Sequence, residues 1–149
     1  MQILEAYQLA ARLHHGQVDK AGRAYIEHLT RVFLRVLAGG GDADQQIAAL
    51  LHDAIEDGKA TVQELLDMGV SQSTMALINT LTKPKGMDYM EYLAGVKSEP
   101  KAVLVKHSDL QDNSDPIRLA ELPDAVAQRL SKKYAQATQF MLSNCFPKR

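Results

Sequence analysis

The residues with the clearest chemical potential lie in one short stretch, residues 48–57, with the sequence AALLHDAIED. On an α-helix, at about 100° per residue, His52 lies one turn below Glu56 and Asp53 one turn below Asp57. This arrangement predicts an imidazole and three carboxylates on one broad helix face. The face has two interpretations, a solvated acidic surface or a cation site. The second explains more, because the carboxylates repel one another and the dipole disfavours them at a helix C-terminus, and a cation offsets both effects.

Two further segments carry side chains of the same kind, HHGQVDKAGRAYIEH at residues 14–28 and VKHSDLQDN at residues 105–113. Taken in order, the three segments resemble the motifs of the HD-domain phosphohydrolases. They are most similar to the hydrolase domain of the Rel/Spo enzymes and their small stand-alone relatives, which remove the 3′-pyrophosphate from (p)ppGpp. The family patterns are H-x-G-Q-x-R-K-x-G-x-x-Y-I-x-H, H-D-x-x-E-D and K-x-x-D-x-x-x-N. The resemblance covers residues 5–115.

The resemblance implies a metal site. In this family a Mn²⁺ ion is held by residues that correspond in position to His28, His52, Asp53 and Asp109. Two imidazoles and two carboxylates with open coordination positions suit Mn²⁺ and related divalent cations. They do not suit a closed structural zinc site, which is built from thiolates. The alternative for His28 is a histidine of the core, and for Asp109 a solvated helix position. A divalent ion would lower the pKa of a bound water and orient a phosphoryl oxygen.

The resemblance also implies catalytic and substrate-binding residues. Glu56 and Asp57 lie one turn beyond the ligands, where a carboxylate can take a proton from water or position it, and the family gives its Glu-Asp pair that role. Lys20 is the retained cation of the first motif, and we expect it to contact phosphate or to stack on a base. Asn113 lies one turn after Asp109 and matches the asparagine that the family has near the nucleotide.

Other polar and aromatic residues are given a structural role. Packing or the surface is expected for His14, His15 and His107, packing for Tyr89 and Tyr92, and the surface for Asp112 and Asp115.

Two departures from the family pattern concern the substrate. Asp19-Lys20 stands where the family has Arg-Lys, whose arginine contacts the guanine base, and Ser114-Asp115-Pro116 stands where the family often has Met-Arg-Thr. Acids therefore replace cations beside the expected polyphosphate pocket. If partly buried, each reversal is expected to disfavour a highly charged ligand by about 1 kcal/mol or more. The metal-binding part of the pattern is complete, whereas the substrate-binding part is not.

The elements that position these residues are expected to be helices. Apolar residues recur at three- and four-residue intervals, and the period-2 alternation of β-branched residues typical of strands is missing. Caps, glycines and prolines predict helices over residues 3–15, 25–38, 44–57, 61–68, 71–82, from 88, from 98 to near Pro116, and 123–144. We therefore predict an all-α helical bundle with short loops.

Composition narrows the class of protein. The chain has 149 residues, 46% of them hydrophobic, the size of one domain, and we expect one HD-type domain over residues 1–149. Seventeen Lys and Arg against eighteen Asp and Glu give a net charge of −1, which does not favour nucleic acid as a partner. No apolar run approaches the length of about 20 residues that crosses a bilayer, and the N-terminus does not resemble a signal peptide. The one cysteine, Cys145, fits a reducing compartment, so we expect a cytoplasmic protein.

These expectations combine into a metal-dependent nucleotide phosphohydrolase, with (p)ppGpp as substrate and pyrophosphate released from the 3′ position. One alternative is another nucleotide with fewer phosphates, which Asp19 and Asp115 would tolerate better. Another is a nucleotide sensor without catalysis, although a mere binding protein has little need of Glu56 and Asp57. The sequence does not specify the oligomeric state.

Overall fold

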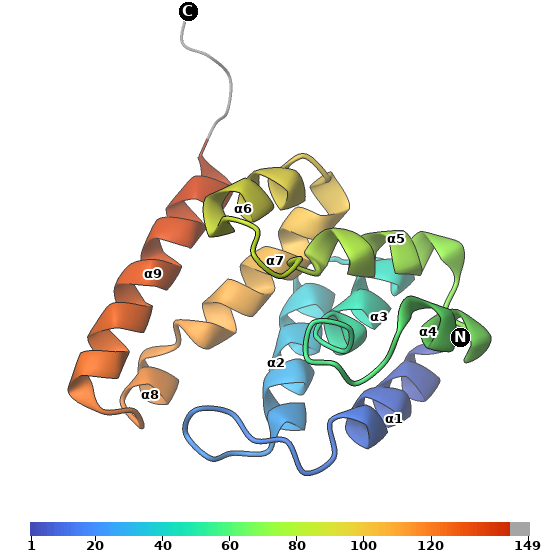
Figure 1. Cartoon of the computed structure of the whole chain (residues 1–149), viewed down its shortest axis with the longest axis horizontal. Helices are drawn as coiled ribbons and strands as arrows, with labels where there is room; N and C mark the ends of the chain where they lie inside the picture. The colour runs from blue at the N-terminus through green and yellow to red at the C-terminus, as the bar shows by residue number, and fades with distance from the viewer. Residues whose placement is uncertain (144–149) are drawn as a thin grey trace, which may run out of the picture.

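The computed structural model describes residues 1–143, which form a bundle of α-helices (Figure 1). The helices are α1 (Ile3–Leu13), α2 (Tyr25–Ala38), α3 (Ala43–Leu51), α4 (Val62–Asp67), α5 (Gln72–Leu81), α6 (Tyr89–Lys97), α7 (Pro100–Asn113), α8 (Pro116–Leu119) and α9 (Asp124–Leu142). Within the described residues the only β pairing is an isolated bridge between Val18 and Ala24. The prediction of an all-α fold is confirmed.

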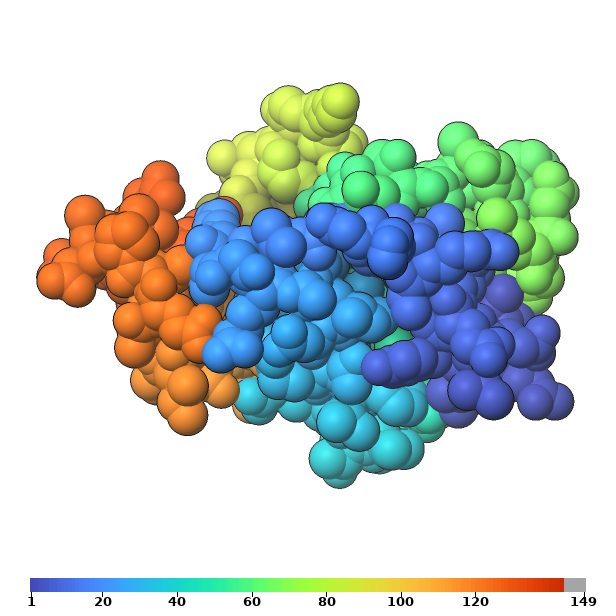
Figure 2. Space-filling view, turned by 90° about the horizontal axis from the view of Figure 1, so that it is seen from below, coloured from blue at the N-terminus to red at the C-terminus, as the bar shows by residue number. Residues whose placement is uncertain are grey.

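Helix α3 lies at the centre of the bundle, where it packs against α1, α2, α5 and α7. Residues 47–51 of α3 are all buried, which is the pattern of a helix enclosed on every side. Helix α7 runs along α2 and α3 and also contacts α6 and α9. Figure 2 shows the segment of α8 and early α9 beside the region around residues 20–30, and ion pairs join the two regions.

Local signals in the sequence set most helix starts. Thr61 and Glu64 form the predicted capping box of α4, and the side chains of Ser71 and Asp88 cap α5 and α6. Pro100 occupies the first turn of α7, where its missing N–H has no helical partner to lose. These starts agree with the sequence because each cap is satisfied within three or four residues.

The helix predicted over residues 44–57 is wrong beyond Leu51. The chain continues from residue 52 as consecutive turns that end at Gly58, whose φ is +70°. The His52 Nδ1–H donates to the carbonyl of Ala49 at 2.8 Å, the acceptor that a continued helix would offer to the N–H of Asp53. His52 and Asp53 therefore lie just beyond the end of α3, and Glu56 and Asp57 lie in the turns that follow.

Two further differences concern the C-terminal part. Pro116, expected only to interrupt a helix, begins the short helix α8. The last helix ends at Leu142, and the predicted end at Asn144 and the cysteine Cys145 lie outside the described residues. Among residues 1–143, no helix is both long and apolar enough to cross a membrane.

The central position of α3 yields a prediction for stability. Leu50 is fully buried, so Leu50→Ala should lower the free energy of unfolding by about 2–5 kcal/mol through lost burial and a residual cavity. Leu4→Ala is the matched control, because Leu4 is 66% exposed. Urea unfolding followed by circular dichroism measures both variants. Equal losses in the two variants would contradict the central role of α3.

Candidate metal centre and adjoining cavity

The fold brings four of the sequence-predicted residues to one point. His28 comes from α2, His52 and Asp53 follow α3, and Asp109 comes from α7. One donor atom from each of these residues lies within 4.8 Å of the others. The Nε2 atom of His28 is 3.0 Å from Asp109 Oδ1, and the Nε2 atom of His52 is 3.2 Å from Asp53 Oδ2. Residues up to 81 positions apart in the chain are therefore in mutual contact.

Neighbouring groups orient both imidazoles in the same way. The Nδ1–H of His52 donates to Ala49 O, and the Nδ1–H of His28 donates to Asp112 Oδ2 at 2.6 Å. Each ring therefore directs its Nε2 atom at the cluster, as a metal-ligating histidine does. His52 Nε2 is buried and has no hydrogen-bond partner. Because an unpartnered buried acceptor is costly, and two nitrogens with two carboxylates suit a divalent cation, the residues fit a divalent metal ion.

The two carboxylates of the cluster are also held by neighbours. The hydroxyl of Tyr25 donates to Asp53 Oδ2 at 2.5 Å, and Lys106 Nζ donates to Asp109 Oδ2 at 3.1 Å. Burial opposes the charge of Asp109, but the charge of Lys106 outweighs it and holds the pKa of Asp109 well below the usual range. Asp109 is thus a carboxylate, the form that binds cations. Tyr25 and Lys106 stand at fixed positions of the family patterns, Y-I-x-H and K-x-x-D, but no role was predicted for either residue.

Glu56 and Asp57 lie in the turns that follow the cluster. Glu56 Oε1 accepts the backbone N–H of Lys83 at 2.7 Å, and Asp57 Oδ2 accepts from Gln17 Nε2 at 2.9 Å. Burial and the nearby charge of Asp53 raise the pKa of both carboxyl groups. One oxygen of each carboxylate is free of these bonds and can accept a proton. Asp57 is positioned through Gln17, which in turn accepts from His14 Nδ1 at 2.8 Å.

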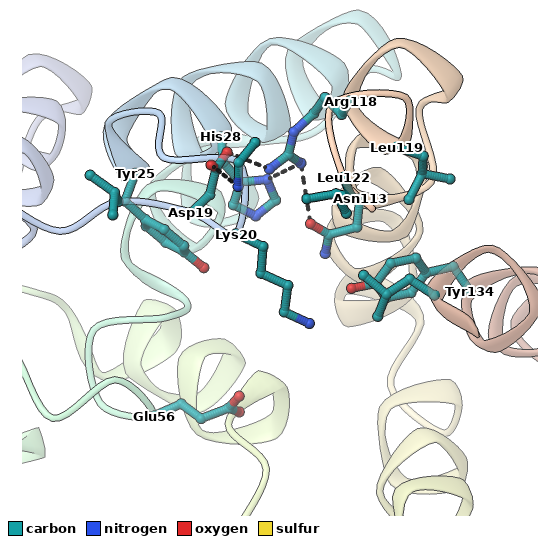
Figure 3. Close-up of a pocket in the computed structure, with 13 residues that line it drawn as sticks. Asp19, Lys20, Tyr25, His28, Glu56, Asn113, Arg118, Leu119, Leu122 and Tyr134 are labelled. Atoms are coloured by element: carbon teal, nitrogen blue, oxygen red, sulfur yellow. Dashed lines mark hydrogen bonds and ion pairs between the residues drawn. The ribbon is translucent and has the colours of Figure 1, made fainter. Parts of the chain in front are cut away.

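The cluster opens onto two adjoining cavities of about 400 Å³ each, which share Tyr25, Glu56, Asn113 and Tyr134 as lining residues. The first cavity has an apolar part and a polar part (Figure 3). The apolar part is lined by Leu119, Leu122 and Leu130, and the polar part by Asp19, Lys20 and Arg118. The second contains most of the cluster and the cations Lys83, Lys106 and Lys133. The second cavity therefore combines carboxylates with cations, and it lies next to the apolar wall of the first.

The two residues predicted to bind substrate line this space. Lys20 is exposed, and its side chain extends into the first cavity (Figure 3). Asn113 lines both cavities, with its Nδ2 donating to Asp109 at 3.2 Å and its Oδ1 accepting from Arg118 at 3.3 Å. Their contact with substrate remains a prediction.

The expected surface position of Asp112 is wrong, because Asp112 is 0% exposed. Its carboxylate is neutralised by Arg31, whose Nε donates at 2.7 Å, and by Arg118, whose Nη1 donates at 2.7 Å. Arg31 is 81 positions from Asp112 in the chain, and Arg118 comes from the helix that follows α7, so no signal local to Asp112 indicated its burial. Asp115 is half-buried, where it caps α8 and lies 3.8 Å from Arg35.

Asp19 is also tied to a cation. Its Oδ2 atom lies 2.9 Å from Arg118 Nη2, and only 7% of its side chain is exposed. Burial opposes the charge of Asp19, but the bonds from the Arg23 backbone and from Arg118 outweigh it and lower its pKa. Asp19 therefore does not present a free negative charge to the cavity. Arg118 supplies a guanidinium near the position where this chain has Asp19 in place of the arginine of the family pattern.

The remaining histidines and tyrosines follow the expectation in part. His14 is buried and stacks on Tyr25 with ring centroids 5.3 Å apart. Tyr92 is buried, and its hydroxyl donates to Leu81 O. Tyr89 is half-buried and lines the second cavity, with Lys133 Nζ 4.7 Å from its ring centroid. His15 is exposed, and His107 is partly exposed.

Comparison with known proteins places these features in a family. A family model described as "HD domain" matches residues 6–113, the range that contains all three motif segments and the four-residue cluster. The chain belongs to the HD-domain family. The resemblance inferred from the motifs is thereby confirmed.

Among curated proteins, the chain is 31% identical over 120 residues to the guanosine-3′,5′-bis(diphosphate) 3′-pyrophosphohydrolase of Aquifex aeolicus (strain VF5), an alignment that covers 75% of this chain and 17% of the relative. It is 29% identical over 127 residues to the GTP pyrophosphokinase of Streptomyces coelicolor, which covers 78% and 15% respectively. This chain thus spans less than a fifth of the length of these two relatives.

A solved structure described as "A metazoan ortholog of SpoT hydrolyzes ppGpp and plays a role in starvation responses" has the same fold. The two structures superpose with a TM-score of 0.76 at 21% sequence identity, and the superposition covers 95% of this chain and 85% of the solved one.

The geometry of the cluster predicts that a divalent cation stabilises the protein. At a Mn²⁺ concentration about 100-fold above its dissociation constant, the native state gains about 2.7 kcal/mol, which should raise Tm by about 5–10 °C at this chain length. Thermal unfolding with Mn²⁺ or with chelator measures the shift. Asp53→Ala should remove it, whereas Asp124→Asn, at the exposed first turn of α9, should retain it. A full shift in Asp53→Ala would place the ion elsewhere.

Proposed function

We propose that this chain is a metal-dependent hydrolase that removes pyrophosphate from the 3′ position of guanosine 3′,5′-bis(diphosphate). The observation that carries the proposal is the cluster of two histidines and two aspartates, which faces a cavity that also contains Glu56, Asp57 and several cations. The names and the 28–31% identity of two pyrophosphohydrolase relatives support the substrate.

The ion is proposed to be Mn²⁺, held by His28, His52, Asp53 and Asp109. When bound, such an ion supplies Lewis-acid chemistry, which makes water more acidic and polarises a phosphoryl oxygen. Around it, Tyr25 and Lys106 keep the two carboxylates in place by the hydrogen bonds described above.

Glu56 and Asp57 are proposed to accept the proton of the attacking water or to position that water. The free Oε2 atom of Glu56 accepts the proton, while the bond from Lys83 N–H to Oε1 fixes the carboxylate. The water oxygen then bonds to the phosphorus attached to the ribose 3′ oxygen, and the bond from that phosphorus to the 3′ oxygen breaks. A proton returns to the 3′ oxygen, so ppGpp and water yield GDP and pyrophosphate.

The two cavities provide the proposed binding site for the nucleotide. Lys20, Lys83 and Lys133 are cations suited to phosphate. The leucines of the first cavity suit the apolar faces of a base, and Asn113 is proposed to contact the nucleotide between the two compartments.

One observation favours the alternative of a nucleotide with fewer phosphates. Lys106 is engaged by Asp109, and Arg118 by Asp19 and Asp112, so that two of the lining cations already have carboxylate partners. Fewer positive charges then remain for phosphates than the number of lining cations indicates.

Three broader expectations accompany the proposal. We propose that the chain acts as one HD-type domain on a small molecule rather than on nucleic acid. The net charge of −1 supports a small-molecule partner, and the low cysteine content supports the cytoplasm.

A nucleotide panel tests the substrate. With Mn²⁺, purified protein is expected to convert ppGpp and pppGpp to GDP and GTP with release of pyrophosphate, as followed by anion-exchange chromatography. Deoxynucleoside triphosphates and nucleoside monophosphates form the rest of the panel. Turnover of those compounds alone would replace the proposed substrate, and binding of ppGpp without any turnover would support a sensor.

The proton acceptor is tested by Glu56→Gln, which keeps the bond from Lys83 but removes the acceptor charge. We expect kcat to fall by about 10²–10⁴-fold, while the Mn²⁺ affinity stays near that of the wild type. Because burial raises the pKa of Glu56 and Asp57, wild-type kcat/KM at saturating Mn²⁺ should fall with decreasing pH at values above the ordinary carboxyl range of about 4. Wild-type kcat in Glu56→Gln would exclude this role.

A further inference from the structure

Arg118 is a side chain of the site that the proposed function does not use. It belongs to α8 and follows the matched family range of residues 6–113. Its guanidinium lies between two carboxylates. The Nη2 atom is 2.9 Å from Asp19 Oδ2 (Figure 3), and the Nη1 atom is 2.7 Å from Asp112 Oδ2. The side chain is 19% exposed, so these bonds are largely shielded from water.

The first of these carboxylates holds a residue of the metal cluster. Asp112 Oδ2 accepts from His28 Nδ1 at 2.6 Å, while Asp112 Oδ1 accepts from Arg31 Nε at 2.7 Å. A carboxylate bonded to the N–H of a ligating imidazole fixes the orientation of the ring, and its loss typically weakens metal binding. Because Asp112 is fully buried, its charge depends on paired cations, of which Arg118 is one.

The second carboxylate holds the loop that carries Lys20. Asp19 Oδ1 accepts the backbone N–H of Ala21 at 2.9 Å and of Arg23 at 3.0 Å, which closes the turn around Lys20. The other oxygen of Asp19 is held by Arg118. The position of this turn relative to the metal cluster therefore depends on the same guanidinium that supports Asp112.

We propose that Arg118 is a positioning residue that holds the metal ligand His28, through Asp112, and the Lys20 turn, through Asp19, in a fixed relation to each other. The inference rests on the proposed metal-binding role of the cluster. A guanidinium is suited to this task because its planar array of N–H donors bonds two carboxylates on different sides at once. The ammonium group of a lysine is a point charge on a flexible stem and lacks this fixed geometry.

The test measures each arm separately in the full chain, with Mn²⁺ alone as the probe. The Mn²⁺ dissociation constant of the metal-free protein is measured by electron paramagnetic resonance, and amide hydrogen exchange reports on the turn at residues 19–23. We expect Arg118→Met to weaken Mn²⁺ binding by about 10–100-fold and to accelerate exchange in the turn. Asp112→Asn should affect mainly Mn²⁺ binding, and Asp19→Asn mainly the exchange.

Arg23→Met is the matched control for the metal arm. Arg23 also pairs with an acid near α8, Glu121 at 3.1 Å, but its side chain is 54% exposed and does not touch Asp112. Its removal should change the Mn²⁺ dissociation constant by less than about twofold, because exposed ion pairs contribute little. An equal loss of affinity in Arg23→Met and Arg118→Met would reduce the effect to general loosening of α8 and overturn the inference.

Arg118→Lys keeps the positive charge and serves if Arg118→Met does not fold. It should lose Mn²⁺ affinity, protection of the turn, or both. If a folded Arg118 variant kept the wild-type Mn²⁺ dissociation constant and the wild-type exchange rates in residues 19–23, this inference would be overturned. The proposed metal role of the cluster would stand. A wild-type protein that binds no Mn²⁺ would instead overturn the proposed metal role, and this inference with it.

Discussion

The packing of α7 against α2 and α3 is the contact on which the candidate site depends. It brings the carboxylate of Asp109 to His28 and to the His52-Asp53 pair, which the chain alone leaves far apart. Anionic oxygens held this close together in a shielded place repel one another. The charge of Lys106 and the hydrogen bond from Tyr25 offset part of that repulsion, so the helices can close around the cluster. Anything that moves α7 would separate the donors.

Much of the fold was predictable because its signals are local. Thr61, Ser71 and Asp88 start helices by capping them within one turn, and sequence alone identifies such positions. The residues of the cluster were predictable for a different reason, since their types and order match a family pattern. The end of α3 at Leu51 was not predictable, because it depends on where the His52 side chain donates its hydrogen bond.

The burial of Asp112 and the pairing of Asp19 were not predictable either. Both depend on Arg118, which comes from a short helix where the sequence predicts only an interruption at Pro116. A motif comparison registers the loss of an arginine next to Lys20. The structure brings a guanidinium to the same turn from about a hundred residues further along the chain. Net charge at a site is a property of the folded chain, and a single motif can misrepresent it.

The two parts of the candidate site come from different elements of the fold, which has a consequence for how substitutions act on them. The four residues of the candidate metal site come from α2, α7 and the end of α3, whereas the leucines of the first cavity come from α8, α9 and the segment between them. Substitutions in that wall would change the lining of the first cavity without touching the four-residue cluster. Arg118 is the exception, because it lines the first cavity and also bonds Asp112, the carboxylate that accepts from His28.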